Sequence, residues 1–235
     1  MTQLKDKVII ITGASGGMGR VVSEALAETG ARLALFSNDS EALCALSEKI
    51  SQKTTCISRT VDVCDEEQVR TAVEETAQQL GAPYALLNLA GLSIPAEISE
   101  MKLADFETVM DVNVQGTFLF SKHFANAVDA QVGGQIINIG SMAAKRANGN
   151  APVYCTAKAA VNMLSAGMAI QYKKLNIRVT TLNPGGTDTP FWGNRPVDRQ
   201  KLMQPDDIAG AILFVLTQDR RVAISELNFE SFLMG

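Results

Sequence analysis

The chain has 235 residues, of which 46% are hydrophobic and 20% charged, a composition typical of globular proteins rather than of disordered or collagen-like chains. Its formal net charge is −4, so it lacks the basic excess that a protein needs to neutralise many nucleic-acid phosphates. We therefore expect no nucleic-acid partner.

The apolar run near the N-terminus, residues 8–11, is too short to span a bilayer, and no small-residue cleavage site follows it. The four cysteines include no C-x-x-C pair, and His123 is the only histidine. A zinc site would need a cluster of such ligands. We expect a cytoplasmic protein with reduced cysteines, no metal site and no membrane contact.

Apolar segments of strand length alternate with longer segments of helical periodicity along the chain, which is the pattern of successive βαβ units. The predicted strands span residues 7–12, 32–37, 55–62, 84–88, 135–140, 177–183 and 224–229. The predicted helices cover residues 18–29, 40–52, 65–80, 103–130, 153–174 and 206–218. The sequence thus predicts one α/β domain over residues 1–235, a doubly wound parallel sheet of about seven strands with helices on both faces.

Glycine residues follow the first predicted strand directly, in the segment TGASGGMG at residues 12–19, and a predicted helix comes next. In a first βα turn, glycines allow the backbone to approach a pyrophosphate, and the helix N-terminus offers N–H groups to it. Gly13, Gly17 and Gly19 are placed for this role. No Lys followed by Ser or Thr comes after Gly19, which excludes a P-loop. The segment predicts a dinucleotide-binding fold of the Rossmann type.

The segment VYCTAKAAV, residues 153–161, carries Tyr154 and Lys158 four residues apart. In a helix, residues at this spacing share a face, so both side chains reach toward one point. A phenol with its ordinary pKa near ~10 is a poor base at neutral pH, and a nearby ammonium group favours the phenolate. The pair alone also suits an ordinary helix surface, but together with other motifs it predicts an acid–base site.

The spacing Gly-x-x-x-Gly-x-Gly, together with Tyr-x-x-x-Lys, resembles the short-chain dehydrogenase/reductase family in its compact single-domain branch, over nearly the whole chain. Asp62-Val63 resembles the family's adenine-contacting pair, and NPGGTDT at 183–189 resembles its stretch beside the nicotinamide. Leu89 departs from the family's Asn-Asn-Ala-Gly element, where it replaces the second Asn and removes an amide from local hydrogen bonding. The cofactor-binding residues implied by the resemblance are Gly13, Ser15, Gly17, Met18, Gly19, Ser37, Asn38, Asp62, Val63, Asn88, Ala90, Gly91, Tyr154, Lys158, Pro184, Gly185, Thr187 and Thr189.

The resemblance also implies four catalytic residues, which are Asn113 in MDVNVQG, Ser141 in NIGS, Tyr154 and Lys158. Tyr154 would act as general acid and base, with its pKa lowered by Lys158. Lys158 would also bond the nicotinamide ribose, Ser141 the substrate oxygen, and Asn113 a water in a proton relay. In this chemistry the cofactor carries the hydride and the protein handles the proton.

The end of the second strand distinguishes NAD from NADP, because an acidic residue there bonds the ribose 2′-OH and repels a 2′-phosphate. Ser37 occupies the place where NAD-specific relatives carry the acid, and its hydroxyl suits a phosphate. Asp39 keeps NAD open as an alternative, and neither Gly16 nor Asn38 is the basic residue that NADP-specific relatives often have. We expect NADP(H) in preference to NAD(H).

The long unpatterned segment at residues 185–204 resembles the family's substrate lid, and long loops in compact domains are usually functional. Apolar and cationic side chains together predict a substrate with a carboxylate, sulfonate or phosphate group, unless the cations are merely solvated. The C-terminal SELNFESFLMG lacks the Asp-Gly-Gly close of many acyl-carrier-protein reductases, which disfavours a β-ketoacyl reductase. The residues that carry the substrate prediction are Phe191, Trp192, Arg195 and Arg199 in the lid, and Lys145 and Arg146 after Ser141.

The motifs together predict an NAD(P)-dependent oxidoreductase that interconverts a small alcohol and its carbonyl by hydride transfer. The alternative is a non-catalytic NAD(P)-sensing protein of the same fold, which would have no need of all four catalytic residues. A sugar-nucleotide epimerase, the third interpretation, usually carries a larger substrate domain. The family commonly forms dimers of dimers through the helices at 103–130 and 153–174, so we expect a homotetramer or else a homodimer.

Overall fold

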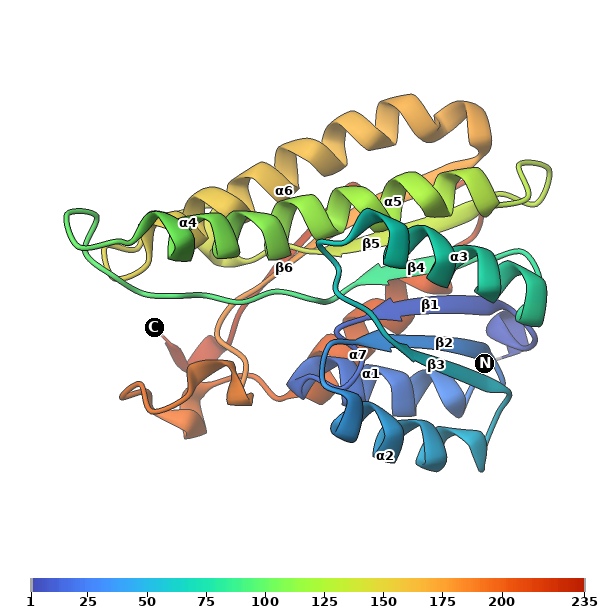
Figure 1. Ribbon diagram of the computed structural model, residues 1–235, viewed down its shortest axis with the longest axis horizontal. Coiled ribbons are helices and arrows are strands. Elements are labelled where there is room, and N and C mark those ends of the chain that lie inside the picture. Colours follow the sequence, from blue (N-terminus) through green and yellow to red (C-terminus); the bar gives the residue numbers. More distant parts are fainter. Residues whose placement is uncertain (1, 235) are drawn as a thin grey trace.

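The computed structural model describes residues 2–234 and has a central sheet with helices on both faces (Figure 1). The strands are β1 (Val8–Thr12), β2 (Arg32–Ser37), β3 (Cys56–Thr60), β4 (Ala85–Asn88), β5 (Gly134–Ile139), β6 (Ile177–Pro184) and β7 (Glu226–Phe229). The α-helices are α1 (Gly17–Ala27), α2 (Ser40–Ser51), α3 (Glu66–Leu80), α4 (Leu103–Met110), α5 (Gly116–Ala127), α6 (Pro152–Gln171) and α7 (Pro205–Leu216). The short helices are η1 (Thr2–Leu4), the π-helical η2 (Asp111–Gln115), η3 (Met142–Ala144), η4 (Tyr172–Leu175), η5 (Pro190–Trp192), η6 (Arg199–Lys201) and η7 (Phe232–Met234).

The sheet has seven strands in the order β3-β2-β1-β4-β5-β6-β7, and every neighbouring pair is parallel. Side chains alternate between two apolar cores along the central strands β1, β2, β4 and β5: Ile9 and Ile11 of β1 pack with α1, α2 and α7, whereas Val8 and Ile10 pack with α3, α5 and α6. Burial on both faces explains why these strands read as continuous apolar runs. The predicted doubly wound α/β fold of the Rossmann type is confirmed.

The predicted helix at 103–130 is interrupted by one π-helical turn, η2, between α4 and α5. The side chain of Asn113 in this turn donates through Nδ2 to the carbonyl oxygens of Val109 and Leu92, both at 2.8 Å. The first bond occupies the Val109 carbonyl oxygen of α4, and the second connects the turn to Leu92 in the segment after β4. Single π-turns inside helices are frequent at functional sites.

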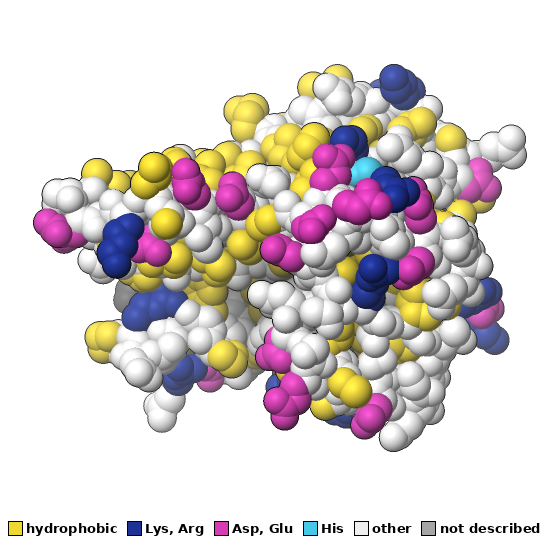
Figure 2. All heavy atoms as spheres, viewed as in Figure 1, with side chains coloured by type: hydrophobic (Ala, Val, Ile, Leu, Met, Phe, Trp, Pro, Cys, Tyr) yellow, Lys and Arg dark blue, Asp and Glu magenta, His cyan; other side chains and the backbone are white. Residues whose placement is uncertain are grey.

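Exposed apolar side chains gather on the outer face of α4, α5 and α6, which we call the α4–α6 face and which lies along the upper part of the molecule in Figures 1 and 2. Its large apolar members are Leu103, Phe106, Phe118, Met163 and Ile170. Within residues 2–234, no helix is both long and apolar enough to cross a membrane. The four cysteines are free thiols.

Candidate active site

The carboxyl ends of the parallel strands meet at one edge of the sheet, where the order of strands reverses between β1 and β4. Ligands of doubly wound sheets bind in the crevice outside such a switch point. The structure brings the loops after β1, β2, β3, β4 and β6 to this edge. The predicted cofactor-binding residues outside α6 lie in these loops, at the strand ends before them or, for Gly17, Met18 and Gly19, in the first turn of α1.

The glycine turn after β1 is packed too tightly for side chains. Gly13 has φ +62°, and a Cβ there would lie 2.8 Å from the backbone nitrogen of Ala90. A Cβ on Gly19 would lie 2.1 Å from the carbonyl oxygen of Gly13, and one on Gly17 would lie 2.7 Å from Cβ of Thr189. These contacts hold α1 close to β1 and bring the segment after β6 against the turn, as a dinucleotide-binding turn requires.

The N-terminus of α1 has the features of an anion site. Its N-cap residue is Gly16, no side chain caps the helix, and its first turn has no acidic residue. The neighbouring helices differ, because Asp39 caps α2 and Asp65 caps α3 through their carboxylates. The N–H groups of α1 therefore remain available to a ligand's phosphate, so the turn fits a dinucleotide.

A cavity of 480 Å³ opens beside this turn and contains three of the four predicted catalytic residues. Ser141, Tyr154 and Lys158 all line it, and Met18 from the first turn of α1 lines it as well. The spacing of Tyr154 and Lys158 places both on one face of α6, with Lys158 Nζ 5.7 Å from the centre of the Tyr154 ring. The cavity thus joins the predicted acid–base residues to the glycine turn.

Tyr154 keeps its proton at neutral pH. Burial is the largest influence and raises the pKa of its phenol to about 12, whereas a hydrogen bond with Ser141 and the charge of Arg195 act in the opposite direction. Lys158 is not among the main influences on this pKa in the chain by itself, so the lowering of the phenol pKa by Lys158 stays a prediction.

Lys158 itself explains that result. Its side chain is only 3% exposed, and burial lowers the pKa of its ammonium group to about 7, so the charge is only partly present at neutral pH. Its Nζ donates to the carbonyl oxygen of Ile139 at 2.9 Å, which fixes the amine at the end of β5.

Asn113 lies behind the cavity and is fully buried. Its Oδ1 has no hydrogen-bond partner among the described residues. This oxygen and Lys158 Nζ both border the space beside Gly91, at 2.7 and 3.2 Å from where a Cβ would stand. An orphaned acceptor next to an amine is a suitable place for a bound water.

Two serines hold the end of β2 against the glycine turn. Ser37 Oγ lies 2.6 Å from Ser15 Oγ, and Ser37 is buried whereas Asn38 is exposed. Asp39, the alternative ribose ligand, uses its Oδ1 to accept the backbone N–H of Ala42 at 3.0 Å. The carboxylate of Asp39 is thus already engaged as a helix cap.

The lid begins and ends at one point, because Thr187 and Met203 form a β-bridge. Inside it, the indole Nε1 of Trp192 donates to the Thr187 carbonyl oxygen at 2.8 Å. The guanidinium of Arg195 lies 4.9 Å from the Phe191 ring centre and 5.1 Å from that of Trp192, and it donates to the carbonyl oxygens of both residues. The Phe191 ring lies 5.6 Å from the Tyr154 ring, so the predicted lid packs against the predicted acid–base residue.

The cations predicted to bind substrate separate into two groups. Arg195 lines the cavity and forms no ion pair within the described chain, and Arg146 lines it but pairs with Glu230. Arg199 pairs with Asp188 at 2.5 Å, and Lys145 pairs with Glu226 outside the cavity. The structure thus brings only two of the four cations to the site.

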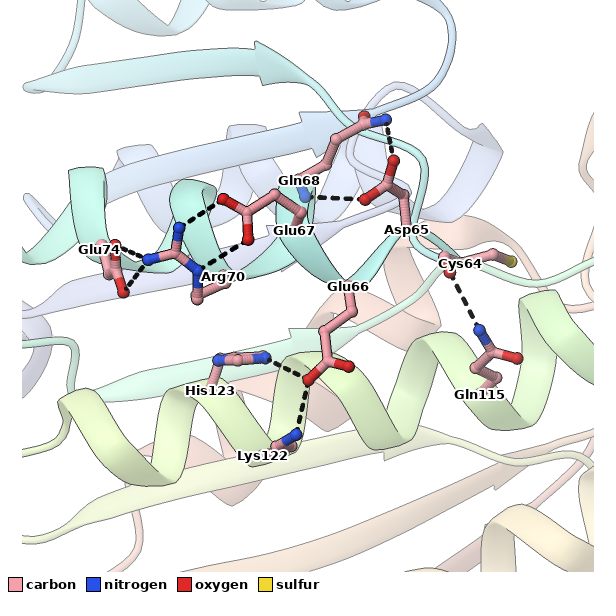
Figure 3. Close-up of polar contacts among 10 residues, drawn as sticks. All are labelled: Cys64, Asp65, Glu66, Glu67, Gln68, Arg70, Glu74, Gln115, Lys122 and His123. Atoms are coloured by element: carbon pink, nitrogen blue, oxygen red, sulfur yellow. Dashed lines mark hydrogen bonds and ion pairs between the residues drawn. The ribbon is translucent and has the colours of Figure 1, made fainter.

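His123 lies away from the cavity, on the surface between α3 and α5. Its Nε2 is 3.2 Å from Glu66 Oε1, which also accepts from Lys122 at 2.6 Å (Figure 3). Earlier in the same helical segment, Gln115 Nε2 donates to the Cys64 carbonyl oxygen at 3.0 Å and anchors the π-turn (Figure 3). Among residues 2–234, no group of three or more His, Cys, Asp or Glu side chains could hold a metal ion.

Sequence reasoning missed several residues of the site. Ser93 and Asn148 line the cavity, and the hydroxyl of Ser93 is buried without a partner in the part of the chain described. Asn183 enters the sequence prediction only as the first residue of NPGGTDT, yet it is fully buried directly behind Ser141. A signal existed for Asn162, which extends the spacing of Tyr154 and Lys158 by one more helical turn.

A sequence model of the short chain dehydrogenase family matches residues 7–200. An uncharacterized oxidoreductase of Staphylococcus saprophyticus is 33% identical over 230 residues, which cover 97% of this chain and 98% of that protein. The chain therefore belongs to the short chain dehydrogenase family of oxidoreductases, as its motifs predict.

Solved structures of the same fold include proteins bound to either nicotinamide dinucleotide. An alcohol dehydrogenase from the archaeon Thermococcus sibiricus, complexed with 5-hydroxy-NADP, matches with a TM-score of 0.90 and 27% identity over 97% of each chain. An NAD⁺-bound xylitol dehydrogenase matches with a TM-score of 0.89 and 26% identity, over 97% of this chain and 99% of the other.

Proposed function

We propose that the protein is an NAD(P)-dependent oxidoreductase that interconverts a small alcohol and its carbonyl. The observation that carries the proposal is that Ser141, Tyr154 and Lys158 share one cavity with the first turn of α1. When bound, the nicotinamide cofactor supplies or accepts the hydride. The uncapped N-terminus of α1 would receive its pyrophosphate, and Lys158 and Thr189 would hold its nicotinamide end.

In the direction of carbonyl reduction, Tyr154 donates its proton to the substrate oxygen, and Ser141 holds that oxygen by a hydrogen bond. The raised pKa of about 12 supports this role, because the phenol is fully protonated at neutral pH. In the direction of oxidation the same residue must act as phenolate, so alcohol oxidation should be favoured by alkaline pH.

Lys158 and Asn113 would resupply the proton. The pKa of Lys158, lowered to about 7, allows the amine to release and take up a proton near neutral pH. A water beside Gly91 would accept from Lys158 and donate to the orphaned Oδ1 of Asn113. This arrangement supports the proton relay that the sequence predicts.

For the cofactor, we propose NADP(H) in preference to NAD(H). No acidic residue ends β2, and the hydroxyl groups of Ser15 and Ser37 lie together beside the glycine turn, where they suit a 2′-phosphate. The carboxylate of Asp39, which would favour NAD, is engaged in capping α2.

For the substrate, we propose an anionic group bound by Arg195. The cavity is lined by three basic residues, Arg146, Lys158 and Arg195, and by no acidic side chain of the described chain. Arg195 lies against the rings of both Phe191 and Trp192 and has no carboxylate partner within ion-pair distance in residues 2–234. A planar guanidinium held in this way suits a carboxylate or phosphate oxygen.

Comparing the kcat of Tyr154→Phe with that of the parent tests the proposed reaction. A panel of carbonyls and alcohols is assayed with NADPH and NADP⁺ at the nicotinamide absorbance, with Tyr172→Phe as the matched control in the same helix region. We expect Tyr154→Phe to lower kcat by at least about a thousandfold with unchanged cofactor affinity, since the hydroxyl handles only the proton. Cofactor binding without any turnover in the parent would instead favour the NAD(P)-sensing alternative.

Arg195→Met tests the substrate class. With a keto acid and its uncharged amide or ester as paired substrates, we expect kcat/KM for the acid to fall at least about a hundredfold and that for the neutral analogue to change little. Arg199→Met, which removes a lid arginine paired with Asp188, is the control. Equal losses of kcat/KM on both substrates would show that Arg195 only stabilises the lid and does not bind the anionic group.

For assembly, we propose a homotetramer that covers the α4–α6 face. Met163 and Ile170 on α6 are 75% and 80% exposed, which leaves apolar surface that a second copy would bury. A homodimer through the same face is the alternative.

A further inference from the structure

A buried amide network lies directly behind the proposed catalytic residues, centred on Asn183 at the end of β6. Asn183 is 0% exposed. Its Oδ1 accepts the backbone N–H of Ser141 at 3.0 Å and Nδ2 of Asn162 at 3.0 Å. Its Nδ2 lies within hydrogen-bond distance of Asn162 Oδ1 at 3.0 Å, Glu226 Oε1 at 3.0 Å and Asn228 Oδ1 at 2.8 Å. Asn183 therefore contacts four separate side-chain or backbone partners.

The orientation of the Asn183 amide is determined by its partners. The backbone N–H of Ser141 can only donate, and the carboxylate of Glu226 can only accept. Oδ1 must therefore face Ser141, and Nδ2 must face β7. A reversed amide would place Nδ2 against the Ser141 N–H, donor against donor, and Oδ1 against the Glu226 carboxylate, acceptor against acceptor.

Asn162 connects this amide to the helix of the acid–base residues. It lies one turn after Lys158 on the same face of α6, and its Nδ2 also donates to the Lys158 carbonyl oxygen at 2.9 Å. Asn183 thus bonds the backbone of Ser141 on one side and, through Asn162, the turn of α6 that carries Lys158 on the other.

The packing leaves no room for Ser141 to move away. A Cβ on Gly140 would lie 2.0 Å from Asn183 Oδ1 and 3.0 Å from Asn162 Nδ2, so the backbone before Ser141 rests against both amides. Ser141 and Tyr154 line the same cavity, and the Ser141 hydroxyl acts to lower the pKa of the Tyr154 phenol. The separation between Ser141 and Tyr154 is thus determined by a rigid, fully bonded group rather than by loop conformation.

We propose that Asn183 and Asn162 are positioning residues that hold Ser141 in register with Tyr154 and Lys158 for proton transfer. The inference rests on the proposed oxidoreductase function. Neither residue lines the cavity, so both act through Ser141 and α6 rather than by touching substrate.

Kinetics of Asn183→Ala and Asn162→Ala test the proposal, with Ser165→Ala as control. Ser165 accepts from Asn138 at 2.8 Å and forms an equivalent buried strand-to-α6 contact that does not reach Ser141. We expect each Asn variant to lower kcat by roughly tenfold to a hundredfold, to leave the cofactor Kd within about twofold and to increase the primary deuterium isotope effect. The double variant should lose no more than the worse single one, because the two residues form one unit.

A second pair of substitutions, which moves the negative charge from residue 226 to residue 183, separates positioning from folding. Asn183→Asp keeps the acceptor for Ser141 but sets a carboxylate against Glu226, and Glu226→Gln in that background restores a donor at residue 226. We expect the double variant to recover most of the kcat lost in Asn183→Asp. Retained kcat in well-folded Asn183→Ala and Asn162→Ala, or the same kcat loss in Ser165→Ala, would overturn the proposal.

Hydrogen exchange of the Ser141 amide gives a result that does not need turnover. We expect this N–H to exchange at least about tenfold faster in Asn183→Ala than in parent or Ser165→Ala. If the parent turns over no alcohol or carbonyl, the proposed function fails by that result, while unchanged Ser141 exchange would overturn the positioning role separately.

Discussion

Lys158 Nζ donates to the carbonyl oxygen of Ile139 at 2.9 Å in a buried site, and this contact places an ionisable amine where its charge is destabilised. Burial lowers the folded pKa from 10.5 to about 7. Below pH 7 the amine is charged in the folded protein as well, so the buried charge lowers the free energy of unfolding by its full amount. Between pH 7 and 10.5 the unfolded chain binds more protons than the folded one, so this lowering fades as pH rises.

We therefore expect Lys158→Met to be inactive but more stable than the parent at pH 7. The gain in free energy of unfolding should be on the order of 1–3 kcal/mol, because the unmade bond to Ile139 offsets part of it. It should fall by about 1.4 kcal/mol for each pH unit between 7.5 and 9.5, so the gain disappears and becomes a loss within this range. Urea unfolding at pH 7.5 and at pH 9.5 measures this change, and Lys174→Met, at an exposed position, serves as control. A gain that is constant with pH would contradict the lowered pKa.

The glycine turn gives a second prediction. Gly19→Ala would set Cβ 2.1 Å from the Gly13 carbonyl oxygen, so α1 must move away from the turn. We expect cofactor affinity to fall at least about tenfold and stability to fall by about 2 kcal/mol. Gly210→Ala in α7 has open space around its Cβ and should stabilise the protein by about 0.5–1 kcal/mol. Calorimetric titration and thermal unfolding distinguish the two; unchanged affinity in Gly19→Ala would contradict the dinucleotide turn.

The sequence predicts those features that depend on local pattern. Alternating apolar runs predict the parallel sheet, the glycine spacing predicts the turn, and the four-residue spacing predicts that Tyr154 and Lys158 share a helix face. Each depends on residues close together in the chain, where periodicity and backbone geometry determine the outcome.

The remaining features depend on contacts distant in sequence. Arg146 pairs with Glu230 and Lys145 with Glu226, so sequence reasoning could not distinguish these cations from Arg195. The pKa of Tyr154 is dominated by burial, which no local pattern reveals. The π-turn at Asn113 likewise needs an acceptor from the segment after β4.

Assembly gives a third prediction. If the protein is the proposed homotetramer, light scattering at micromolar concentration should give four times the chain mass of 25.1 kDa, whereas the homodimer alternative gives twice that mass. Met163→Glu should produce smaller species, because it places a charge in the centre of a buried apolar contact. Val132→Glu alters an exposed apolar residue outside this face and should leave the mass unchanged. A parent that scatters as a monomer would contradict both the tetramer and the dimer.

The last prediction concerns the cofactor, and it depends on Ser37. Its hydroxyl lies 2.6 Å from Ser15 Oγ beside the uncapped N-terminus of α1, so Ser37→Asp places a carboxylate where a ribose 2′-substituent would lie. That carboxylate can bond a 2′-OH but repels a 2′-phosphate, so the ratio of kcat/KM for NADP to that for NAD should fall by at least roughly tenfold. Ser40→Asp adds the same charge three residues further on, in the first turn of α2, and should change the ratio less than about twofold. Both cofactors are measured at one ionic strength. A parent that already prefers NAD strongly would show that Asp39 is the ribose ligand, and a ratio unchanged by Ser37→Asp would show that residue 37 does not face the ribose.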